Sequence, residues 1–397
     1  MNGPGEYAGW LRPLLLALYA RDPNLDATVF FVPDDFATGR EATVAGREFP
    51  RLRTFEPREY LRFALGGRLE RAPKTVDRVQ YLGGDLMHAA RVNDRLGGVA
   101  TSYKFSRPRY RRRFARVFAV DQQNREQLLA WKTPPERIDV VGNLAIDGAL
   151  REAQTPLEAD SHDALASNAV VIMPGSRRSE IANMVPFFLR VALHLRELDA
   201  AVRVVFGISP FTTIDELRAA LASGGLPTAY GVRGHVEERD GTLFLCTGGL
   251  EVPVARAALR AATRARLAVT IPGTKTIELA ALGVPTIVTV PFNAPEAVVI
   301  TGPLQYVERI PFVGIPIKRS LAVRFSQRFR FFAQPNVDAG RELFPELAGT
   351  LTPGFVARAI YERYCEPDWR AEISDELRAL YAGHAGASQR MAEALAA

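Results

Sequence analysis

The sequence predicts an α/β protein of two Rossmann-like domains, and three observations support this prediction. Short apolar runs rich in β-branched residues alternate with helix-like stretches along most of the 397 residues, which is typical of βαβ units around a parallel sheet. The alternation pauses once, in the polar residues 152–167, and then resumes, as expected for a linker between two domains. Several apolar runs end in turns with glycine or proline, and parallel sheets bind their ligands at these carboxyl ends.

The first half of the chain carries the elements of one such domain, which we expect to cover residues 1–150. The expected strands are residues 27–32, 78–82, 116–120 and 138–141, and the expected helices are residues 11–20, 86–96 and 124–131. A Rossmann half normally opens with a strand of about five residues, but only Met1 and Asn2 precede the loop Gly3-Pro4-Gly5-Glu6. We therefore expect the first strand to be missing from the given start.

The second half repeats the pattern, and we expect a second domain at residues 168–374. Its expected strands are residues 169–173, 203–207, 242–246, 267–271 and 284–290, and its expected helices are residues 181–198, 276–282, 356–363 and 375–395.

Composition narrows the class of protein. With 47% hydrophobic and 24% charged residues, the chain is neither disordered nor collagen-like, and no apolar run reaches the ~18 residues of a membrane-spanning helix. Two cysteines, Cys246 and Cys365, and five scattered histidines argue against a disulfide framework or a metal site. No signal peptide is visible, so we expect a cytoplasmic protein without a metal or a tightly bound cofactor.

The turn after residues 169–173 is a candidate phosphate site. Gly175 and Ser176 would expose backbone N–H groups where a helix begins, Arg177 would add a full positive charge, and Glu180 follows in the first helical turn. The alternative is an ordinary βα turn in which a serine caps the helix.

A second candidate loop follows residues 267–271. Its small residues, Gly273, Thr274 and Thr276, would let a ligand approach the backbone, and Lys275 lies between the threonines. Glu278 could accept hydrogen bonds from two vicinal sugar hydroxyls, or it could simply favour the helix dipole.

The third candidate loop, Gly83-Gly84-Asp85, follows residues 78–82. Asp85 could act as a general base, with His88 one helical turn further on as the alternative base. The competing interpretation is that Asp85 only caps the next helix.

Positive charge is densest at residues 107–113, which contain Arg107, Arg109, Arg111, Arg112 and Arg113. An anionic membrane surface, nucleic acid or plain solvent could face this segment. No nucleic-acid-binding signature accompanies it, so nucleic acid is not the favoured partner.

Several loops together resemble the lipid-A-disaccharide synthases and their relatives, glycosyltransferases of the two-domain GT-B fold. The matching segments occur in the same order along most of the chain: Gly5-Glu6, Gly84-Asp85, Val141-Gly142-Asn143 with Asp147, Pro174-Gly175-Ser176-Arg177 with Glu180, Gly273-Thr274 with Thr276 and Glu278, Gln334-Pro335-Asn336, Ala339-Gly340-Arg341, Pro345-Glu346-Leu347 and Thr352-Pro353. The likeness is better kept in the second half than in the first, where Leu144 replaces a family proline.

The resemblance implies an active site in a cleft between the domains, with residues 375–397 returning to the first domain. It also implies roles for individual residues: Gly5 and Glu6 in an acceptor loop, Asp85 as the base, and Asn336 near the donor sugar. The UDP-sugar donor would be held by Gly175, Ser176, Arg177, Glu180, Gly273, Thr274, Lys275, Thr276, Glu278 and Asn336.

The sequence therefore predicts an inverting, metal-independent glycosyltransferase. It would move a sugar from a UDP-sugar to a lipid-linked acceptor, at the cytoplasmic face of a membrane that residues 107–113 touch. Two alternatives remain: a UDP-sugar epimerase of the UDP-GlcNAc 2-epimerase type, and a non-catalytic protein that binds an anionic ligand.

Overall fold

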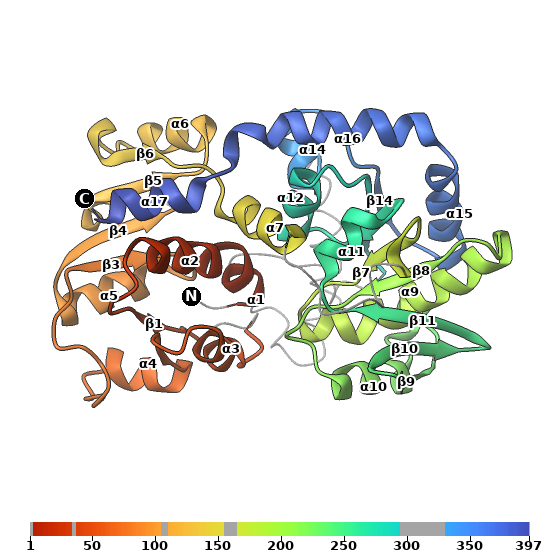
Figure 1. Ribbon diagram of the computed structural model, residues 1–397, viewed down its shortest axis with the longest axis horizontal. Helices are drawn as coiled ribbons and strands as arrows, with labels where there is room; N and C mark the ends of the chain where they lie inside the picture. The colour runs from red at the N-terminus through yellow and green to blue at the C-terminus, as the bar shows by residue number, and fades with distance from the viewer. Residues whose placement is uncertain (1–2, 34–36, 105–109, 155–164, 294–329, 397) are drawn as a thin grey trace. The chain divides into compact units, whose positions relative to one another are not determined.

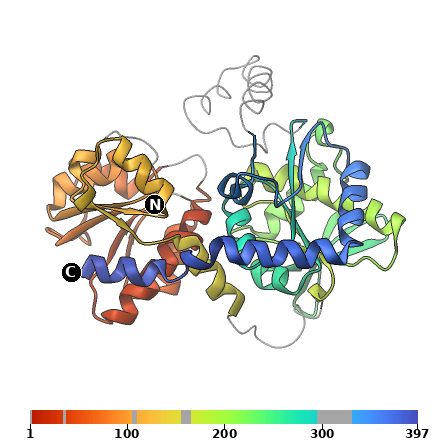
Figure 2. The same ribbon diagram turned by 90° about the horizontal axis from the view of Figure 1, so that it is seen from above.

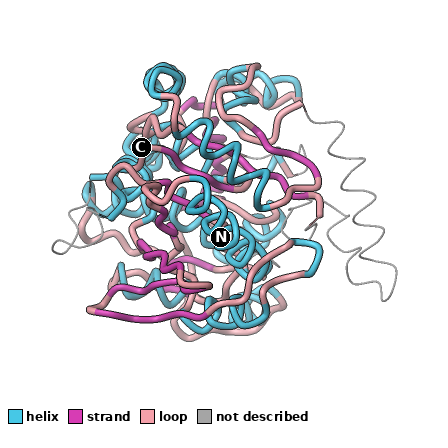
Figure 3. Tube along the Cα trace, turned by 90° about the vertical axis from the view of Figure 1, so that its right-hand side faces the viewer, coloured by secondary structure: helices cyan, strands magenta, loops and turns pink. Residues whose placement is uncertain are grey.

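The computed structural model describes residues 3–33, 37–104, 110–154, 165–293 and 330–396. It divides into two compact units (Figures 1 and 2). Unit 1 comprises residues 1–148 and 381–397, and unit 2 comprises residues 149–380. Each unit is an α/β structure, and Figure 3 shows both helices and strands along the trace.

Unit 1 is built around a parallel sheet of four strands in sequence order. These strands are β3 (Arg78–Tyr81), β4 (Val99–Tyr103), β5 (Arg116–Ala119) and β6 (Ile138–Val140). A separate parallel pair is formed by β1 (Thr28–Phe30) and β2 (Arg53–Phe55). Its helices are α1 (Pro4–Glu6), α2 (Arg12–Arg21), α3 (Glu41–Glu48), α4 (Pro57–Ala64), α5 (Leu86–Leu96), α6 (Gln122–Ala130) and the start of α7 (Leu144–Gln154), with a π-helical turn at Tyr7–Leu11.

The last helix, α17 (Ala387–Ala396), belongs to unit 1 although it comes at the end of the chain. Asp147 in α7 accepts hydrogen bonds from the backbone N–H groups of Gly386 and Ser388 at 2.7 and 2.6 Å, and from the Ser388 hydroxyl at 2.6 Å. The guanidinium of Arg390 donates to the Val141 carbonyl at 2.8 Å. These bonds tie α17 to the end of the four-stranded sheet.

Unit 2 contains an eight-stranded sheet in the order β14-β13-β12-β7-β8-β11-β10-β9. The six strands from β14 to β11 run parallel to one another. From β11 the sheet continues through β10 and β9, and each of these pairs antiparallel with the strand before it in the sheet. The strands are β7 (Val170–Met173), β8 (Val204–Gly207), β9 (His235–Arg239), β10 (Thr242–Thr247), β11 (Leu250–Ala255), β12 (Leu267–Thr270), β13 (Thr286–Pro291) and β14 (Glu346–Gly349). Its helices are α9 (Arg178–Leu198), α10 (Ile214–Ser223), α11 (Ala258–Arg264), α12 (Thr274–Ala281), α14 (Gln334–Ala339), α15 (Pro353–Tyr364) and α16 (Pro367–Tyr381).

The helix α9 anchors the core of unit 2. It packs beside α10 and α15, and its apolar face contributes fully buried residues such as Phe187, Phe188 and Leu195 to the cluster over the parallel strands. Strands β7, β12 and β13 are buried along their whole length, as expected for a parallel sheet covered on both faces.

The strand order of unit 2 contains a topological switch point between β7 and β12. From β7 the chain moves to β8 on one side of the sheet, and after β11 it crosses back to β12 on the other side of β7. Ligands of open α/β sheets bind outside the carboxyl ends of strands at such a point. The fold therefore indicates the loops after β7 and β12 as the place to look for a ligand site in unit 2.

Two of the expected elements need correction. The expected helix at residues 375–395 is interrupted: α16 ends at Tyr381, and a 3-10 turn (Ala382–His384) separates it from α17. The break falls where Gly386 has a φ of +79°, a conformation that glycine adopts without strain. The expected linker at residues 152–167 begins too early, because Glu152 still lies in α7, and residues 155–164 lie outside the described residues.

Candidate functional site

The structure brings the first two candidate loops together at the switch point. The last residues of β7 and β12, Met173 and Thr270, are partners in the parallel ladder. The Thr270 hydroxyl donates to the Met173 carbonyl at 3.2 Å. The loops that continue from these residues therefore leave the same edge of the sheet from adjacent strands.

Glu180 organises the first of these loops. Its carboxylate is buried and accepts hydrogen bonds from the backbone N–H groups of Ser176 at 2.8 Å and Arg177 at 3.0 Å. The Arg177 guanidinium donates to the other carboxylate oxygen at 2.9 Å. A negative side chain at a helix N-terminus is stabilised by the dipole as well as by these donors. The Glu180 carboxylate thus accepts the backbone N–H groups of Ser176 and Arg177 that were expected to bind a phosphate.

Gly175 fits this arrangement for a geometric reason. Its φ is +104°, and a Cβ atom added there would come within 2.8 Å of the Glu180 Cβ. The Glu180 side chain folds back over the turn and leaves no room for a side chain at position 175. The predicted contact of Gly175, Ser176 and Arg177 with a diphosphate stays a prediction, and it requires Glu180 to release these N–H groups.

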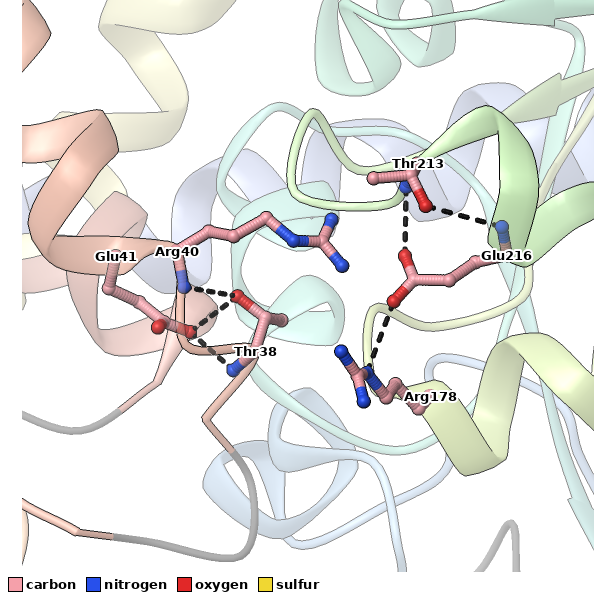
Figure 4. A network of polar contacts seen from close by, with 6 residues as sticks. All are labelled: Thr38, Arg40, Glu41, Arg178, Thr213 and Glu216. Atoms are coloured by element: carbon pink, nitrogen blue, oxygen red, sulfur yellow. Dashed lines mark hydrogen bonds and ion pairs between the residues drawn. The ribbon is translucent and has the colours of Figure 1, made fainter.

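The next residue, Arg178, is oriented by an acidic partner from another helix (Figure 4). Its Nε donates to Glu216 at 3.2 Å, while the same carboxylate accepts from the backbone N–H of Thr213 at 2.8 Å. Thr213 in turn caps α10 by accepting from the Glu216 N–H at 3.2 Å. The Arg178 side chain is largely exposed, so its charge faces solvent beside the switch-point loop.

A similar arrangement occurs in unit 1, where the Glu41 carboxylate accepts a backbone N–H near the start of α3 (Figure 4). Its buried carboxylate accepts from the backbone N–H of Thr38 at 2.7 Å and from the Thr38 hydroxyl at 2.9 Å. The Arg40 N–H donates to the Thr38 hydroxyl at 3.3 Å.

The second switch-point loop leads directly into α12. Gly273 is its N-terminal cap, with a φ of +153° that favours glycine, and makes no side-chain capping bond. Thr276 is fully buried and its hydroxyl donates to the Gly273 carbonyl at 2.8 Å. Unlike α9, this helix has no acidic residue in its first turn. Its N-terminal dipole is therefore not balanced by an acidic side chain there.

Lys275 and Glu278 form an ion pair on α12. The Lys275 Nζ lies 2.5 Å from Glu278 Oε2, and Glu278 is buried. Burial raises the pKa of Glu278, and the Lys275 charge opposes this rise. Burial works to lower the pKa of Lys275, but the carboxylates of Glu278 and Glu152 outweigh it and raise this pKa. Glu152 is itself fixed by the Leu259 N–H at 3.2 Å, at the start of α11.

Asn336 is buried and fully hydrogen-bonded within the protein. Its amide nitrogen donates to the Phe344 carbonyl and to Glu346, both at 2.8 Å, and its oxygen accepts from Leu343 and Phe344 N–H groups, both at 2.8 Å. An Asn side chain has two donors and two acceptor positions, and all four are used here. Asn336 therefore stabilises the turn between α14 and β14, and its expected contact with a donor sugar gains no support.

In unit 1 the structure brings Glu6 and Asp85 close to the same turn. A Cβ atom at Gly83 would come within 2.6 Å of Glu6 Oε1, so the carboxylate packs directly on the Gly83-Gly84 turn. The Tyr81 hydroxyl donates to the Gly84 carbonyl at 2.7 Å. Burial raises the pKa of Tyr81, and the charges of Glu6 and Asp85 raise it further. Gly5 precedes Glu6 in α1.

Asp85 and His88 both have structural contacts. Asp85 is exposed and caps α5, because its Oδ1 accepts from the Met87 N–H at 2.8 Å. The His88 Nδ1 lies 2.7 Å from the Tyr60 hydroxyl, which ties the imidazole to the core of unit 1. The capping interpretation of Asp85 is thus confirmed, and its catalytic role stays a prediction.

The arginine-rich segment is described only in part. Arg107 and Arg109 lie outside the described residues. Arg111, Arg112 and Arg113 form a short 3-10 turn after Tyr110, which has a φ of +64°. Arg113 pairs with Asp94 on α5. Within the part of the chain that the structure describes, no helix is both long and apolar enough to cross a membrane.

The structure brings together one cluster of residues of the kinds that bind metals, which the sequence analysis did not predict. His235, Glu237 and Cys246 have their ligand atoms within 4.8 Å of one another, because Cys246 and His235 are opposite residues of the β9–β10 ladder. The His235 Nε2 lies 2.8 Å from Glu237, and the Arg239 guanidinium lies 3.2 Å from the same carboxylate. This cluster is on the antiparallel meander rather than at the switch point.

Solved structures of similar fold cover nearly the whole chain. A proposed UDP-N-acetylglucosamine 2-epimerase from Listeria monocytogenes is 14% identical, with 98% of this chain and 93% of that chain covered and a TM-score of 0.60. A UDP-N-acetylglucosamine 2-epimerase is 17% identical over 99% and 93%, with a TM-score of 0.55. The Methanocaldococcus jannaschii UDP-GlcNAc 2-epimerase in complex with UDP-GlcNAc and UDP is 14% identical over 100% and 98%, with a TM-score of 0.51. No protein-family model and no curated protein matches the chain.

These likenesses confirm the predicted α/β architecture of the GT-B type. They also correct the functional expectation. The similar structures are those of UDP-GlcNAc 2-epimerases, which favours the epimerase alternative and overturns the expected sugar transfer to a lipid-linked acceptor.

The sequence analysis did not predict three acidic side chains that accept backbone N–H groups near helix starts of unit 2. Glu152, Glu216 and Glu346 each accept a backbone N–H at or beside the start of a helix. Glu216 alone had a local signal, since Thr213 three residues earlier forms a capping box with it. The other two act on segments far along the chain, which no local pattern reveals.

Proposed function

We propose that this protein is an enzyme acting on a UDP-sugar, and that its reaction is epimerisation at C2 of a UDP-GlcNAc-type substrate. The observation that carries the proposal is the fold: nearly the whole chain matches structures described as UDP-GlcNAc 2-epimerases, one of them in complex with UDP-GlcNAc and UDP. The switch point of unit 2 supports a nucleotide site, because ligands of such sheets bind there.

In this proposal the UDP moiety lies against the N-terminus of α12. Gly273, Thr274 and Thr276 keep side chains small where the diphosphate approaches the backbone, and the α12 dipole favours an anion. Lys275 and Arg178 supply full positive charges at the two switch-point loops. No resident metal or cofactor enters this account.

The buried carboxylate of Glu278 is placed to accept hydrogen bonds from the ribose hydroxyls. Among the described residues Lys275 is its one ion-pair partner, and no backbone N–H donates to it. An ionised carboxylate can accept about four hydrogen bonds, and Lys275 occupies only part of this capacity. Buried polar groups are usually hydrogen-bonded, so the ribose hydroxyls would fill the remaining acceptor positions of Glu278.

Epimerisation at C2 requires a base and an acid on opposite faces of the sugar. The C2 proton is not acidic, because no carbonyl group adjoins C2. Its removal is therefore coupled to the departure of UDP from C1, which yields a glycal and UDP. Readdition of UDP to C1, with a proton delivered to the other face of C2, gives the epimer with no net change of composition.

We assign the acid and base roles to carboxylates of unit 1. Glu6 and Asp85 flank the Gly83-Gly84 turn, and Asp85 is exposed with only one oxygen used for capping. His88 is the second choice for a base, since its Nδ1 is engaged with Tyr60.

The test is turnover of UDP-GlcNAc by Asp85→Asn and Glu6→Gln, with Asp77→Asn as the matched control at an exposed carboxylate outside the turn. Loss of general acid or base catalysis typically lowers the rate by about 10²–10⁴-fold. We expect such losses for the first two variants, unchanged UDP affinity in calorimetry, and wild-type turnover for the control. Wild-type turnover of both test variants would remove these carboxylates from the mechanism.

A further inference from the structure

A cavity of unit 2, of about 660 Å³, lies at the opposite end of the parallel strands from the switch-point loops. Asn168, Arg266 and Pro285 line it, and these residues directly precede or lie just before β7, β12 and β13. The cavity therefore faces the amino ends of the parallel strands, whereas the switch-point loops leave their carboxyl ends. Its volume is that of a small-molecule site.

The lining of this cavity is strongly basic. Arg266, Arg370 and Arg378 contribute to it, and no aspartate or glutamate is among the lining residues. Arg378 has an acidic neighbour in Asp375 at 3.2 Å. Among the described residues, no carboxylate pairs with Arg266 or Arg370.

Tyr364, the last residue of α15, holds these two arginines in place. Arg266 stacks on its ring, with the guanidinium carbon 4.5 Å from the ring centroid. Arg370 donates to its backbone carbonyl. The Tyr364 hydroxyl donates to the Asn168 carbonyl at 3.0 Å, which fixes the ring against the rim of the cavity. These contacts therefore hold the guanidinium groups of Arg266 and Arg370 in fixed orientations.

This arrangement is costly without a counter-ion. Both guanidinium groups belong to half-buried residues. Burial lowers the pKa of Arg370, and the neighbouring charge of Arg266 lowers it further. Like charges held close in a partly desolvated site repel each other, and an anion between them removes that penalty.

We propose that this cavity is a binding site for a phosphate or diphosphate group, separate from the switch-point loops. Arginine's planar fork suits bidentate bonds to phosphate oxygens, and two such forks offer donors to both phosphoryl groups of a diphosphate. Arg378 has a different role: a Cβ at Gly283 would come within 2.6 Å of its Nε, so it covers the C-terminus of α12, where a cation is favoured by the dipole.

Calorimetric titration with inorganic pyrophosphate tests the proposal on the full chain. We expect Arg266→Gln and Arg370→Gln each to weaken pyrophosphate binding by about tenfold or more, since each variant removes a charge-assisted hydrogen-bond donor to the phosphate oxygens. Arg358→Gln, at an exposed arginine of α15 outside the cavity, is the matched control and should bind as the wild type.

Two further variants separate this cavity from other sites. Lys275→Gln alters the switch-point loop and should leave the cavity's affinity unchanged. Tyr364→Phe keeps the ring and the carbonyl and should retain binding, whereas Tyr364→Leu loses the stacking surface and should weaken it. Melting curves confirm that each variant is folded. Absence of pyrophosphate binding, or binding that Lys275→Gln abolishes and both arginine variants leave intact, would overturn the proposal and leave Arg266 and Arg370 as structural contacts of Tyr364.

Discussion

Glu180 folds back over Gly175, so that the turn after β7 has no room for a side chain at position 175. A Cβ atom there would come within 2.8 Å of the Glu180 Cβ, and Gly175 has a φ of +104°. The carboxylate then reaches the N–H groups of Ser176 and Arg177. A loop that resembles a phosphate cradle in sequence is thus organised by an internal anion.

Gly175→Ala should destabilise the protein through both backbone strain and steric overlap. We expect a loss of about 2–4 kcal/mol in the free energy of unfolding by urea. Gly273→Ala is the matched control, because its φ is +153° but no atom beyond its chain neighbours lies within 4 Å of the added Cβ. It should cost only the strain, about 1–2 kcal/mol. Equal losses in both variants would show that Glu180 does not crowd position 175.

Removal of the Glu180 carboxylate should convert the helix start into an anion site. In Glu180→Ala the N–H groups of Ser176 and Arg177 lose their acceptor, and inorganic phosphate can take its place. We expect added phosphate to raise the melting temperature of this variant more than that of the wild type. Glu180→Gln keeps an acceptor oxygen and should respond as the wild type does. An identical phosphate response in all three proteins would contradict this account of the loop.

The Lys275–Glu278 pair predicts a specific pH dependence. Burial raises the pKa of Glu278 above its ordinary 4.5, so the folded state holds this proton more tightly than the unfolded state does. The associated stability is fully present below pH 4.5 and is lost as pH rises through the folded-state pKa. Lys275 limits the loss by stabilising the carboxylate.

Lys275→Met should enlarge this loss. Because Lys275 is about one-third exposed, solvent screens the pair, and we expect the variant to lose about 1–3 kcal/mol more than the wild type between pH 4.5 and pH 7.5. Urea unfolding across this range measures the loss. The double variant Lys275→Met/Glu278→Gln carries no buried charge at this place and should show no extra pH dependence. A single variant whose stability follows the wild-type pH curve would contradict the ion pair.

Asp147 should control the attachment of α17. Three hydrogen bonds to one carboxylate make Asp147→Ala cost about 2–4 kcal/mol at this helix. Hydrogen exchange of the α17 amides should become faster while that of α9 stays unchanged. Ser388→Ala removes one of the three bonds and should have a smaller effect. Unchanged exchange in α17 of Asp147→Ala would show that other contacts hold this helix.

Asn336→Ala should behave as a core variant and not as a ligand-site variant. It leaves the buried Phe344 backbone and the half-buried Glu346 carboxylate without these bonds, so we expect a loss of about 2–4 kcal/mol in the free energy of unfolding. UDP affinity, measured by calorimetry below the melting temperature, should stay within about twofold of the wild type. A selective loss of UDP affinity with unchanged stability would restore Asn336 to the donor site.

The sequence predicted those elements whose signals are local. The helix expected at residues 86–96 coincides with α5, because Asp85 caps it and apolar residues recur on one face. Buried strands such as β7 and β12 were equally clear from their β-branched runs. The prediction of one helix over residues 375–395 was wrong in its middle, where Ala382–His384 form a 3-10 turn and Gly386 has a φ of +79°. The Gly386 N–H donates to Asp147, which lies far away in the sequence, and no local pattern reveals this contact.

The candidate site was predictable in its position but not in its bonding. The order of strands puts the loops after Met173 and Thr270 side by side, as expected for a Rossmann-like sheet. The role of Glu180 was not predicted, because a phosphate-binding turn and a turn closed by its own glutamate have the same sequence pattern. The choice between sugar transfer and epimerisation rests on groups that act on the sugar, and no local motif distinguishes these reactions.

The most direct test of the central proposal is to incubate the purified protein with UDP-GlcNAc alone in D2O and follow the sugar by proton NMR. The account predicts the C2 epimer, UDP-N-acetylmannosamine, together with loss of the H2 signal as deuterium from solvent enters C2. Unchanged UDP-GlcNAc with a fully retained H2 signal, under conditions where calorimetry shows UDP-GlcNAc bound, would contradict it.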